Sequence, residues 1–234
     1  PGIYMDWVVD RSFIMPYPSG DGAAYFERLA YIRDQQGLDV LIPNLDAELP
    51  LYLKRAGELK DMGIATFLPS MEQFKLRGKD KLAEVAERMD IKLPKTKVCT
   101  SLDQLIAAVD ELGLPVMVKG SFYKAYAAYT STQAVSHFHA LVAEWGYPVI
   151  VQSIVSGEEL NVIGVGDGEG GSLGLVGIKK ISVTSLGKIW TGVTIKHRAM
   201  LAAANRFIRE LKWRGPFELE CIVKGDDVFL IEIN

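Results

Sequence analysis

Acidic and amide side chains gather near the end of the chain, in the stretch FELECIVKGDDVFLIEIN at residues 217–234. Two runs of alternating apolar residues flank a Lys-Gly-Asp-Asp segment, which is the pattern of a β-hairpin. With the loop at residues 225–227, Glu220 lies opposite Glu232 and Glu218 lies opposite Asn234. Successive side chains of a strand point to opposite faces. One face of the hairpin therefore carries four polar groups: Glu218, Glu220, Glu232 and Asn234.

The chemistry that this face could perform is the binding of a hard divalent cation. Carboxylates directly opposite each other destabilise a sheet unless something compensates their charge. Carboxylate and amide oxygens are the ligands that Mg²⁺ prefers, and Mg²⁺ usually enters a site as a bridge to phosphates. The alternative is a solvated outer face, where acids cost nothing. The opposite face is predicted to be buried, and its members are Phe217, Leu219, Cys221, Phe229, Ile231 and Ile233.

Two other segments could bind a phosphorylated ligand. Lys119 ends the apolar strand predicted at 114–120 and can place its ammonium on a phosphate, although lysines at strand ends are also common as surface residues. The stretch PVIVQSIVSGEELNV at 148–162 is a buried strand that runs into a hinge at Gly157, followed by two acids. Backbone groups at such a hinge can bind the edge of an adenine, and an acid just beyond it can accept from ribose hydroxyls. A plain edge strand with a turn is the alternative.

The elements that position these residues fall into two groups. Over the first 70 residues strands and helices alternate, which indicates a parallel α/β sheet. The expected elements are a strand at 3–10, a helix at 23–37, an apolar run at 38–49, a helix at 51–63 and a strand at 64–70. Ligands of such sheets bind beyond the carboxyl ends of strands. Asp46 and Glu48 fall there, as candidates for binding an amine or as first-turn acids of the next helix.

The remainder of the chain mixes helices with strands. Asp80 is expected to cap a helix that runs to about Asp90, and Ser101 to cap the next helix. The other expected elements are helices at 101–113 and 132–146, strands at 147–155 and within 156–184 around a glycine-rich turn, and a helix within 191–215 closed by Gly215. The fold class is therefore α/β or α+β.

Composition excludes several classes of protein. The 234 residues are 49% hydrophobic and 24% charged, with a net charge of −3, so nothing points to a nucleic-acid partner. No apolar run approaches the length of a membrane span, and no secretory signal is visible. Cys99 and Cys221 lie in apolar contexts, which favours reduced, buried thiols in a cytoplasmic protein. The start at Pro1 and the end within a strand lead us to expect a fragment of a longer chain.

Taken together, these segments resemble the ATP-grasp superfamily, and most of all the branch of the carbamoyl-phosphate synthase large chain and biotin carboxylase. The most specific motif is the spacing of twelve between Glu220 and Glu232 with the ending IEIN. The resemblance implies that Glu220, Glu232 and Asn234 bind Mg²⁺. It implies nucleotide contacts from Lys81, Lys119, Gln152, Ser153, Val155 and Glu159. Lys119 and Lys180 would be the catalytic cations, whereas Lys179 points the other way.

The resemblance also implies a domain organisation and a reaction. A partial Rossmann-like domain would span 1–75, a linker helix 76–93, a small lid subdomain 94–154, and a truncated large subdomain 155–234. ATP would bind with two Mg²⁺ ions between the last two. The reaction would be a ligation of a carboxylate to an amine through an acyl phosphate, and a homodimer is left open.

Two departures keep other functions open. The family's loop after the lid lysine is rich in glycine, whereas here it reads SFYKAYAAYT at 121–130, where Lys124 could supply charge instead. The family also continues beyond IEIN to an arginine. The alternative is therefore a non-catalytic module that binds Mg²⁺ and ATP. A dinucleotide-binding domain is disfavoured, because the glycine-rich stretch 164–171 lies between strands with no helix after it.

Overall fold

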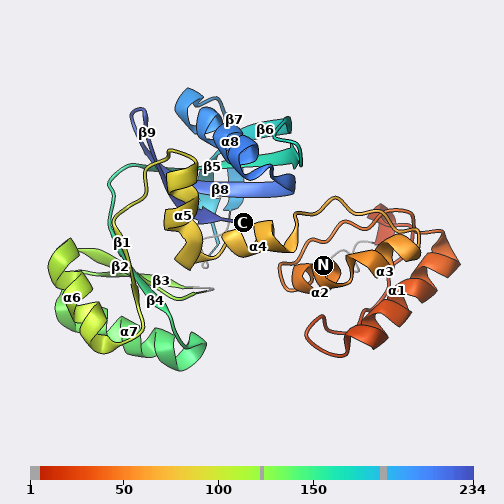
Figure 1. The fold of residues 1–234 in the computed structure, drawn as a ribbon, viewed down its shortest axis with the longest axis horizontal. Helices are drawn as coiled ribbons and strands as arrows, with labels where there is room; N and C mark the ends of the chain where they lie inside the picture. The colour runs from red at the N-terminus through yellow and green to blue at the C-terminus, as the bar shows by residue number, and fades with distance from the viewer. Residues whose placement is uncertain (1–5, 122–123, 185–188) are drawn as a thin grey trace. The chain divides into compact units, whose positions relative to one another are not determined.

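The computed structural model describes residues 6–121, 124–184 and 189–234. The chain divides into two compact units, Pro1–Met71 and Glu72–Asn234. Figure 1 shows the helices and strands of each unit. Within the described residues, none of the helices is both long enough and apolar enough to cross a membrane.

The first unit is built mainly from helices. They are the 3₁₀-helix η2 (Asp6–Val8), α1 (Gly22–Gln36), α2 (Leu49–Lys54) and α3 (Ala56–Asp61). The side chain of Asp21 caps α1 by accepting from the amide of Ala23 at 2.8 Å, and Gly37 ends the helix in a left-handed conformation with φ 67°. An apolar cluster holds the unit together: Tyr25, Phe26, Leu29, Tyr52, Leu59, Ile64 and Leu68.

Several expectations for this unit were wrong in detail. Residues 6–8 form a 3₁₀-turn rather than part of a strand, and residues 3–5 lie outside the described residues. The helix expected at 51–63 is broken at Arg55 into α2 and α3. Where an apolar run at 38–49 and a strand at 64–70 were expected, the described residues of this unit form one parallel bridge, which joins Val40 to Ala65. Val40 and Ile42 are exposed, whereas Leu38 and Leu41 pack against the apolar cluster, so this apolar run is buried only in part.

Short helices open the second unit: α4 (Met71–Leu76), η3 (Lys79–Lys81) and α5 (Leu82–Arg88). Asp80 does not cap α5, since it lies inside the 3₁₀-turn and the capping position is Lys81, which makes no side-chain cap. The chain leaves α5 through Asp90, whose φ is 49°.

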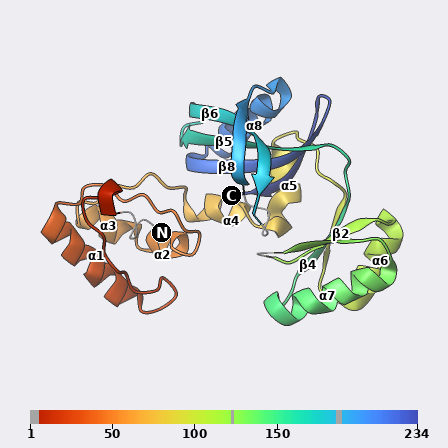
Figure 2. The same ribbon diagram turned by 180° about the vertical axis from the view of Figure 1, so that it is seen from behind.

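A small sheet with the strand order β1-β4-β2-β3 follows. Its strands are β1 (Thr96–Cys99), β2 (Val116–Lys119), β3 (Ala125–Ala128) and β4 (Val149–Ser153), and all of their pairings are antiparallel. Helices α6 (Leu102–Leu112) and α7 (Ser131–Trp145) contact these strands and lie side by side in both views (Figures 1 and 2). Ser101 caps α6, as predicted, by accepting from the amide of Gln104. This subdomain has its own apolar core, in which Leu105, Val118 and Phe138 are buried.

A larger antiparallel sheet with the order β7-β6-β5-β8-β9 completes the unit. Its strands are β5 (Glu158–Asp167), β6 (Ser172–Val183), β7 (Ile189–Ile195), β8 (Arg214–Lys224) and β9 (Asp227–Ile233). Helix α8 (Arg198–Leu211) packs against the sheet through Met200, Phe207 and Ile208, which join Leu160 and Leu219 in a second core. This helix ends at Lys212 in a left-handed conformation rather than at Gly215, which belongs to β8.

The glycine-rich stretch is a hairpin turn between β5 and β6, as predicted. Asp167 organises it by accepting from the amides of Glu169 at 2.7 Å and Gly171 at 2.9 Å. These backbone hydrogen bonds lower the pKa of the Asp167 carboxyl.

The final hairpin pairs its polar residues as predicted, but by a different route. Its loop is two residues long, so Lys224 pairs with Asp227 instead of Val228. Gly225, with φ 61°, occupies the first turn position, where a two-residue hairpin favours glycine. Between Cys221 and Glu220 the partner strand carries one extra residue, Ile231. This β-bulge restores the pairing of Glu220 with Glu232.

Because of the bulge, the buried residues of β9 differ from those predicted. Leu230 and Val228 are buried in the core, whereas Phe229 and Ile231, which were expected there, are only partly buried. Ile231 lies instead on the same side as the acids and lines the cleft described next. The one-residue shift at the turn and the bulge thus cancel for the polar residues and not for these two apolar ones.

Candidate functional site

A cleft of about 340 Å³ separates the small sheet from the hairpin. Seven of the residues predicted to have a role line it, together with apolar side chains that include Met117, Ile222 and Ile231. The seven are Lys119, Gln152, Ser153, Val155, Glu159, Glu220 and Glu232.

The small sheet contributes a lysine held by a neutral amide. Lys119 and Gln152 lie on adjacent strands, and the Lys119 Nζ donates to Gln152 Oε1 at 2.7 Å. The Gln152 Nε2 donates in turn to the Thr96 hydroxyl at 2.9 Å, and Gln152 is only 3% exposed. Burial, together with nearby Lys79, lowers the pKa of the Lys119 ammonium from its ordinary 10.5 to about 8, against the attraction of the surrounding acids. Its charge is therefore not fixed at mildly alkaline pH.

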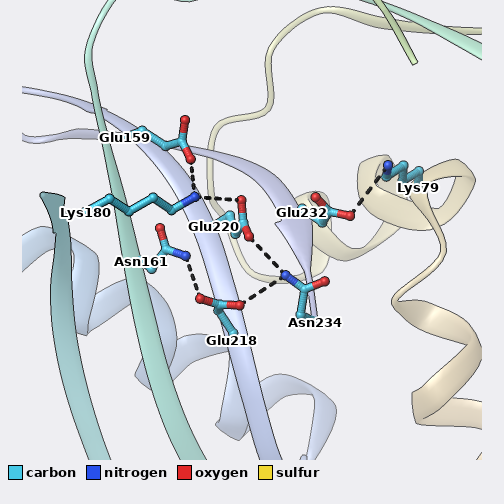
Figure 3. Close-up of polar contacts among 8 residues, drawn as sticks. All are labelled: Lys79, Glu159, Asn161, Lys180, Glu218, Glu220, Glu232 and Asn234. Atoms are coloured by element: carbon cyan, nitrogen blue, oxygen red, sulfur yellow. Dashed lines mark hydrogen bonds and ion pairs between the residues drawn. The ribbon is translucent and has the colours of Figure 1, made fainter. Parts of the chain in front are cut away.

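Across the cleft, the large sheet contributes carboxylates that are already paired with cations (Figure 3). Lys180 on β6 forms an ion pair with Glu159 and a longer one, at 3.4 Å, with Glu220. Lys79 pairs with Glu232 at 3.5 Å. Burial by itself lowers the pKa of Lys180, but the two carboxylates outweigh it and raise the pKa overall. Burial raises the pKa of Glu220 despite the opposing effect of Lys180.

Two amides complete the acidic side. Asn234 Nδ2 donates to Glu220 Oε1 at 3.1 Å and to Glu218 Oε2 at 3.2 Å. Asn161 on β5 donates through Nδ2 to Glu218 Oε1 at 2.6 Å. Because both Asn234 hydrogen bonds go to carboxylates, which only accept, its Oδ1 is the atom left to bind a cation.

The donor set fits a hard divalent cation. In the part of the chain that the structure describes, no three His, Cys, Asp or Glu side chains form a metal cluster by themselves. A site here would consist of the Glu220 and Glu232 carboxylates and the Asn234 Oδ1, with further oxygens from water and phosphate. That composition is usual for Mg²⁺, which keeps several waters and takes only one or two protein carboxylates.

One predicted contact falls elsewhere, and one residue was missed. Lys81 is half exposed and pairs with Glu84 at 3.8 Å, and neither it nor Lys79 is among the residues that line the cleft. The linker lysine that reaches the acids is Lys79, at the start of the 3₁₀-turn, with a side chain that is 11% exposed. The sequence KDK contains both lysines, and the 3₁₀-turn decides which of the two side chains points toward the acids.

Other charged candidates lie outside the cleft. Lys124 pairs with Glu144 at 2.7 Å, and Lys179 pairs with Glu158, as expected for a side chain opposite to Lys180. Glu48 occupies the capping position of α2 without making a side-chain cap, and it accepts from the Tyr25 hydroxyl at 3.2 Å. Cys99 and Cys221 are free and buried, and burial raises the pKa of the Cys221 thiol to about 12.

Comparison with known proteins identifies the fold. No protein-family model matches the sequence. Among solved structures, the biotin carboxylase domain of 2-oxoglutarate carboxylase from Hydrogenobacter thermophilus, in complex with MgADP and bicarbonate, aligns with a TM-score of 0.74 at 14% identity. That alignment covers 98% of this chain and 55% of the other.

Two further enzymes agree. D-alanine–D-alanine ligase from Bacillus anthracis, complexed with ATP, aligns with a TM-score of 0.65 at 18% identity, over 88% of this chain and 72% of its own. N5-carboxyaminoimidazole ribonucleotide synthetase, in its ADP complex, aligns with a TM-score of 0.71 at 16% identity. That alignment covers 97% of this chain and 59% of the other. The chain thus spans between half and three quarters of these enzymes. It has the ATP-grasp fold, of α+β class, as the resemblance of its motifs predicted.

Proposed function

We propose that this chain is the nucleotide-binding part of an ATP-dependent ligase, which joins a carboxylate to an amine or a related nucleophile through an acyl phosphate. The observation that carries the proposal is the cleft, where Lys119 faces the paired carboxylates Glu220 and Glu232 across an apolar-lined space. A cation on one side of the cleft can bind a polyphosphate, and carboxylates on the other side can bind the metal that accompanies it. The structural neighbours that hold ATP, ADP or MgADP support this assignment.

We assign the roles of the nucleotide-binding residues as follows. The adenine would lie among Met117, Ile222 and Ile231, with its polar edge against the backbone at Ser153 and Val155, where β4 ends. Glu159 would accept from the ribose. It now pairs with Lys180, so nucleotide binding would free Lys180 for the terminal phosphate.

Phosphoryl transfer needs positioning and neutralisation of charge more than a nucleophilic side chain. Lys119 and Lys79 would bind phosphate oxygens from one side and Lys180 from the other. Glu220, Glu232 and the Asn234 Oδ1 would hold Mg²⁺, which supplies charge stabilisation to the β- and γ-phosphates when bound. Their ion pairs with Lys180 and Lys79 hold these carboxylates beside the cleft.

The competing function is a module that binds nucleotide without turnover, and the turn after Lys119 favours it. The amide of Gly120 donates to the carbonyl of Lys124 at 3.1 Å, which closes a short hairpin between β2 and β3. Residues 122 and 123 of the loop at 121–130 lie outside the described residues. Backbone amides without a Cβ cradle phosphates best, and residues 121–130 contain no glycine, which leaves Gly120 alone.

Release of ADP and phosphate separates the two functions. A ligase releases both only when a suitable carboxylate is supplied with ATP and Mg²⁺, and an added amine raises the rate further. Screening simple carboxylates and amino acids, with Lys180→Met as the inactive control, gives the substrate class. Tight nucleotide binding with no product release from any acceptor would favour the binding module. Because one neighbour is a dimer, light scattering of the same sample tests whether this chain also dimerises.

A further inference from the structure

Glu218 is an acid at the metal face to which the proposed function assigns no role. It lies on β8, two residues before Glu220, and is partly buried. Lys180 and Lys79 pair with other carboxylates, and in the described part of the chain no ion pair involves Glu218. Its two oxygens are occupied by amides instead, Oε1 by Asn161 at 2.6 Å and Oε2 by Asn234 at 3.2 Å. Figure 3 shows the three side chains in one row.

The chemistry of this row fixes the orientation of each amide. An ionised carboxylate only accepts hydrogen bonds, so an amide beside it must present its NH₂ group. Asn234 presents Nδ2 to Glu218 and to Glu220, which uses both of its protons. Its Oδ1 is therefore turned away from Glu218. If the Asn234 amide rotated by half a turn, an oxygen would face two carboxylates.

The backbone holds the same pair in register. The amide of Glu218 donates to the carbonyl of Asn234, and the amide of Asn234 donates to the carbonyl of Glu218, each at 2.8 Å. The two residues thus form a directly opposed pair at the end of the hairpin, where their side chains are neighbours on one face. Glu218 can act on the Asn234 side chain without any movement of the strands.

Asn161 contributes to this row of side chains although its own burial is energetically unfavourable. It is fully buried, and its Oδ1 has no hydrogen-bond partner. An unsatisfied buried acceptor costs about 1–3 kcal/mol. An apolar residue at this position would avoid that cost, so the hydrogen bond from Asn161 to Glu218 is the feature that the asparagine provides. It anchors Oε1 and leaves Oε2 for Asn234.

We propose that Glu218 is a positioning residue, anchored by Asn161, which orients the Asn234 amide so that its Oδ1 faces the metal. This inference rests on the proposed function, since it presupposes that Asn234 binds Mg²⁺. It does not make Glu218 a metal ligand. Partners that orient metal ligands commonly change metal affinity by about 10- to 100-fold when they are replaced.

The test is calorimetric titration of ADP, with and without Mg²⁺, on the chain carrying Glu218→Gln. A glutamine at this position has one acceptor and one NH₂ group, so it cannot accept from both amides. We expect the Mg²⁺-dependent gain in ADP affinity to fall by at least about tenfold, with binding of metal-free ADP unchanged. Glu210→Gln, which alters an exposed acid on α8 paired with Arg209, is the matched control and should bind as wild type does.

A second variant keeps the test independent of whether Glu218→Gln folds. Should Glu218→Gln fail to fold, Glu218→Asp, which shortens the reach by one methylene, should show the same selective loss.

The outcomes separate this inference from the proposed function. Wild-type Mg²⁺ dependence in Glu218→Gln, or equal loss of metal-free and Mg²⁺-dependent binding, would each overturn the role of Glu218 alone. A wild-type chain whose ADP binding does not respond to Mg²⁺ would overturn both.

Discussion

The two sheets of the second unit face one cleft with opposite arrangements of charge. The small sheet places a single lysine there, and its hydrogen-bond partner is the neutral amide of Gln152. The large sheet places carboxylates there, and Glu159, Glu220 and Glu232 each pair with a lysine. The difference teaches that the carboxylates of the large sheet have cationic partners before any ligand binds, whereas the charge of Lys119 on the small sheet depends on pH.

The sheets also have separate interiors. The small sheet packs on α6 and α7 around Leu105 and Phe138, and the large sheet packs on α8 around Phe207 and Leu219. Substitutions at the cleft surface of one sheet therefore leave the core of the other intact. This separation allows the two sides of the cleft to be tested independently.

The largest effect that we predict on the side of the small sheet follows removal of its cation, Lys119. Lys119→Met should weaken ADP binding by about 10- to 100-fold, because a hydrogen bond to a charged group contributes about 1.5–3 kcal/mol. The measurement is calorimetric titration near pH 7. Lys97→Met is the matched control, since Lys97 lies on β1 of the same subdomain and pairs with Glu111 at 2.7 Å. Equal loss in both variants would show that the effect is not specific to the cleft.

A pH series sharpens the contrast between the two sides. Since burial lowers the pKa of Lys119 to about 8, ADP affinity should be level below pH 8 and fall by up to about tenfold per unit above it. Gln152→Glu gives Lys119 an anionic partner and should move the fall to higher pH. An affinity that does not change between pH 7 and 9.5 in wild type would contradict the assignment of Lys119 as a phosphate ligand.

The stability of the free protein should change in the opposite direction over the same range. Between pH 8 and 10.5 the unfolded chain holds a proton on Lys119 that the folded chain has lost, so this group makes the free energy of unfolding rise with pH. Lys119→Met should remove that rise. Urea unfolding at three pH values measures it, and an identical slope in wild type and variant would contradict the lowered pKa.

The smallest effect distinguishes the two linker lysines. Lys79→Ala should weaken ADP binding by about fivefold, the equivalent of about 1 kcal/mol, because its side chain reaches Glu232 within the cleft. Lys81→Ala should change affinity by less than about twofold, since an exposed ion pair such as that with Glu84 contributes little. The reverse order would restore the contact that the motif resemblance predicted for Lys81.

How far the sequence predicts the site depends on the element. Alternation placed Glu220 opposite Glu232 and Glu218 opposite Asn234, and the structure confirms both pairs. The prediction assumed a loop of three residues, where the structure has two. It also missed the bulge at Ile231, because period-2 alternation does not reveal a bulge. As a result, Ile231 was predicted to be buried, whereas in the structure it lines the cleft.

Where local patterns were weak, the sequence predicted less. The linker lysines are two residues apart, and a 3₁₀-turn before α5 decides which one faces the acids. Helix periodicity does not reveal that turn. In the first unit, apolar runs around Val40 and Ala65 suggested strands, yet one bridge is formed. The Lys119–Gln152 contact depends on strand order within the small sheet, which no local pattern specifies.

The central claim, that the hairpin acids bind the metal of a bound nucleotide, is tested most directly by calorimetric titration of ATP with and without Mg²⁺. Wild type is compared with the double variant Glu220→Ala and Glu232→Ala. We predict that Mg²⁺ strengthens binding to wild type, and that the double variant loses this gain while its unfolding remains cooperative. Equal Mg²⁺ dependence in both proteins, or no binding of ATP or ADP to wild type, would contradict the account.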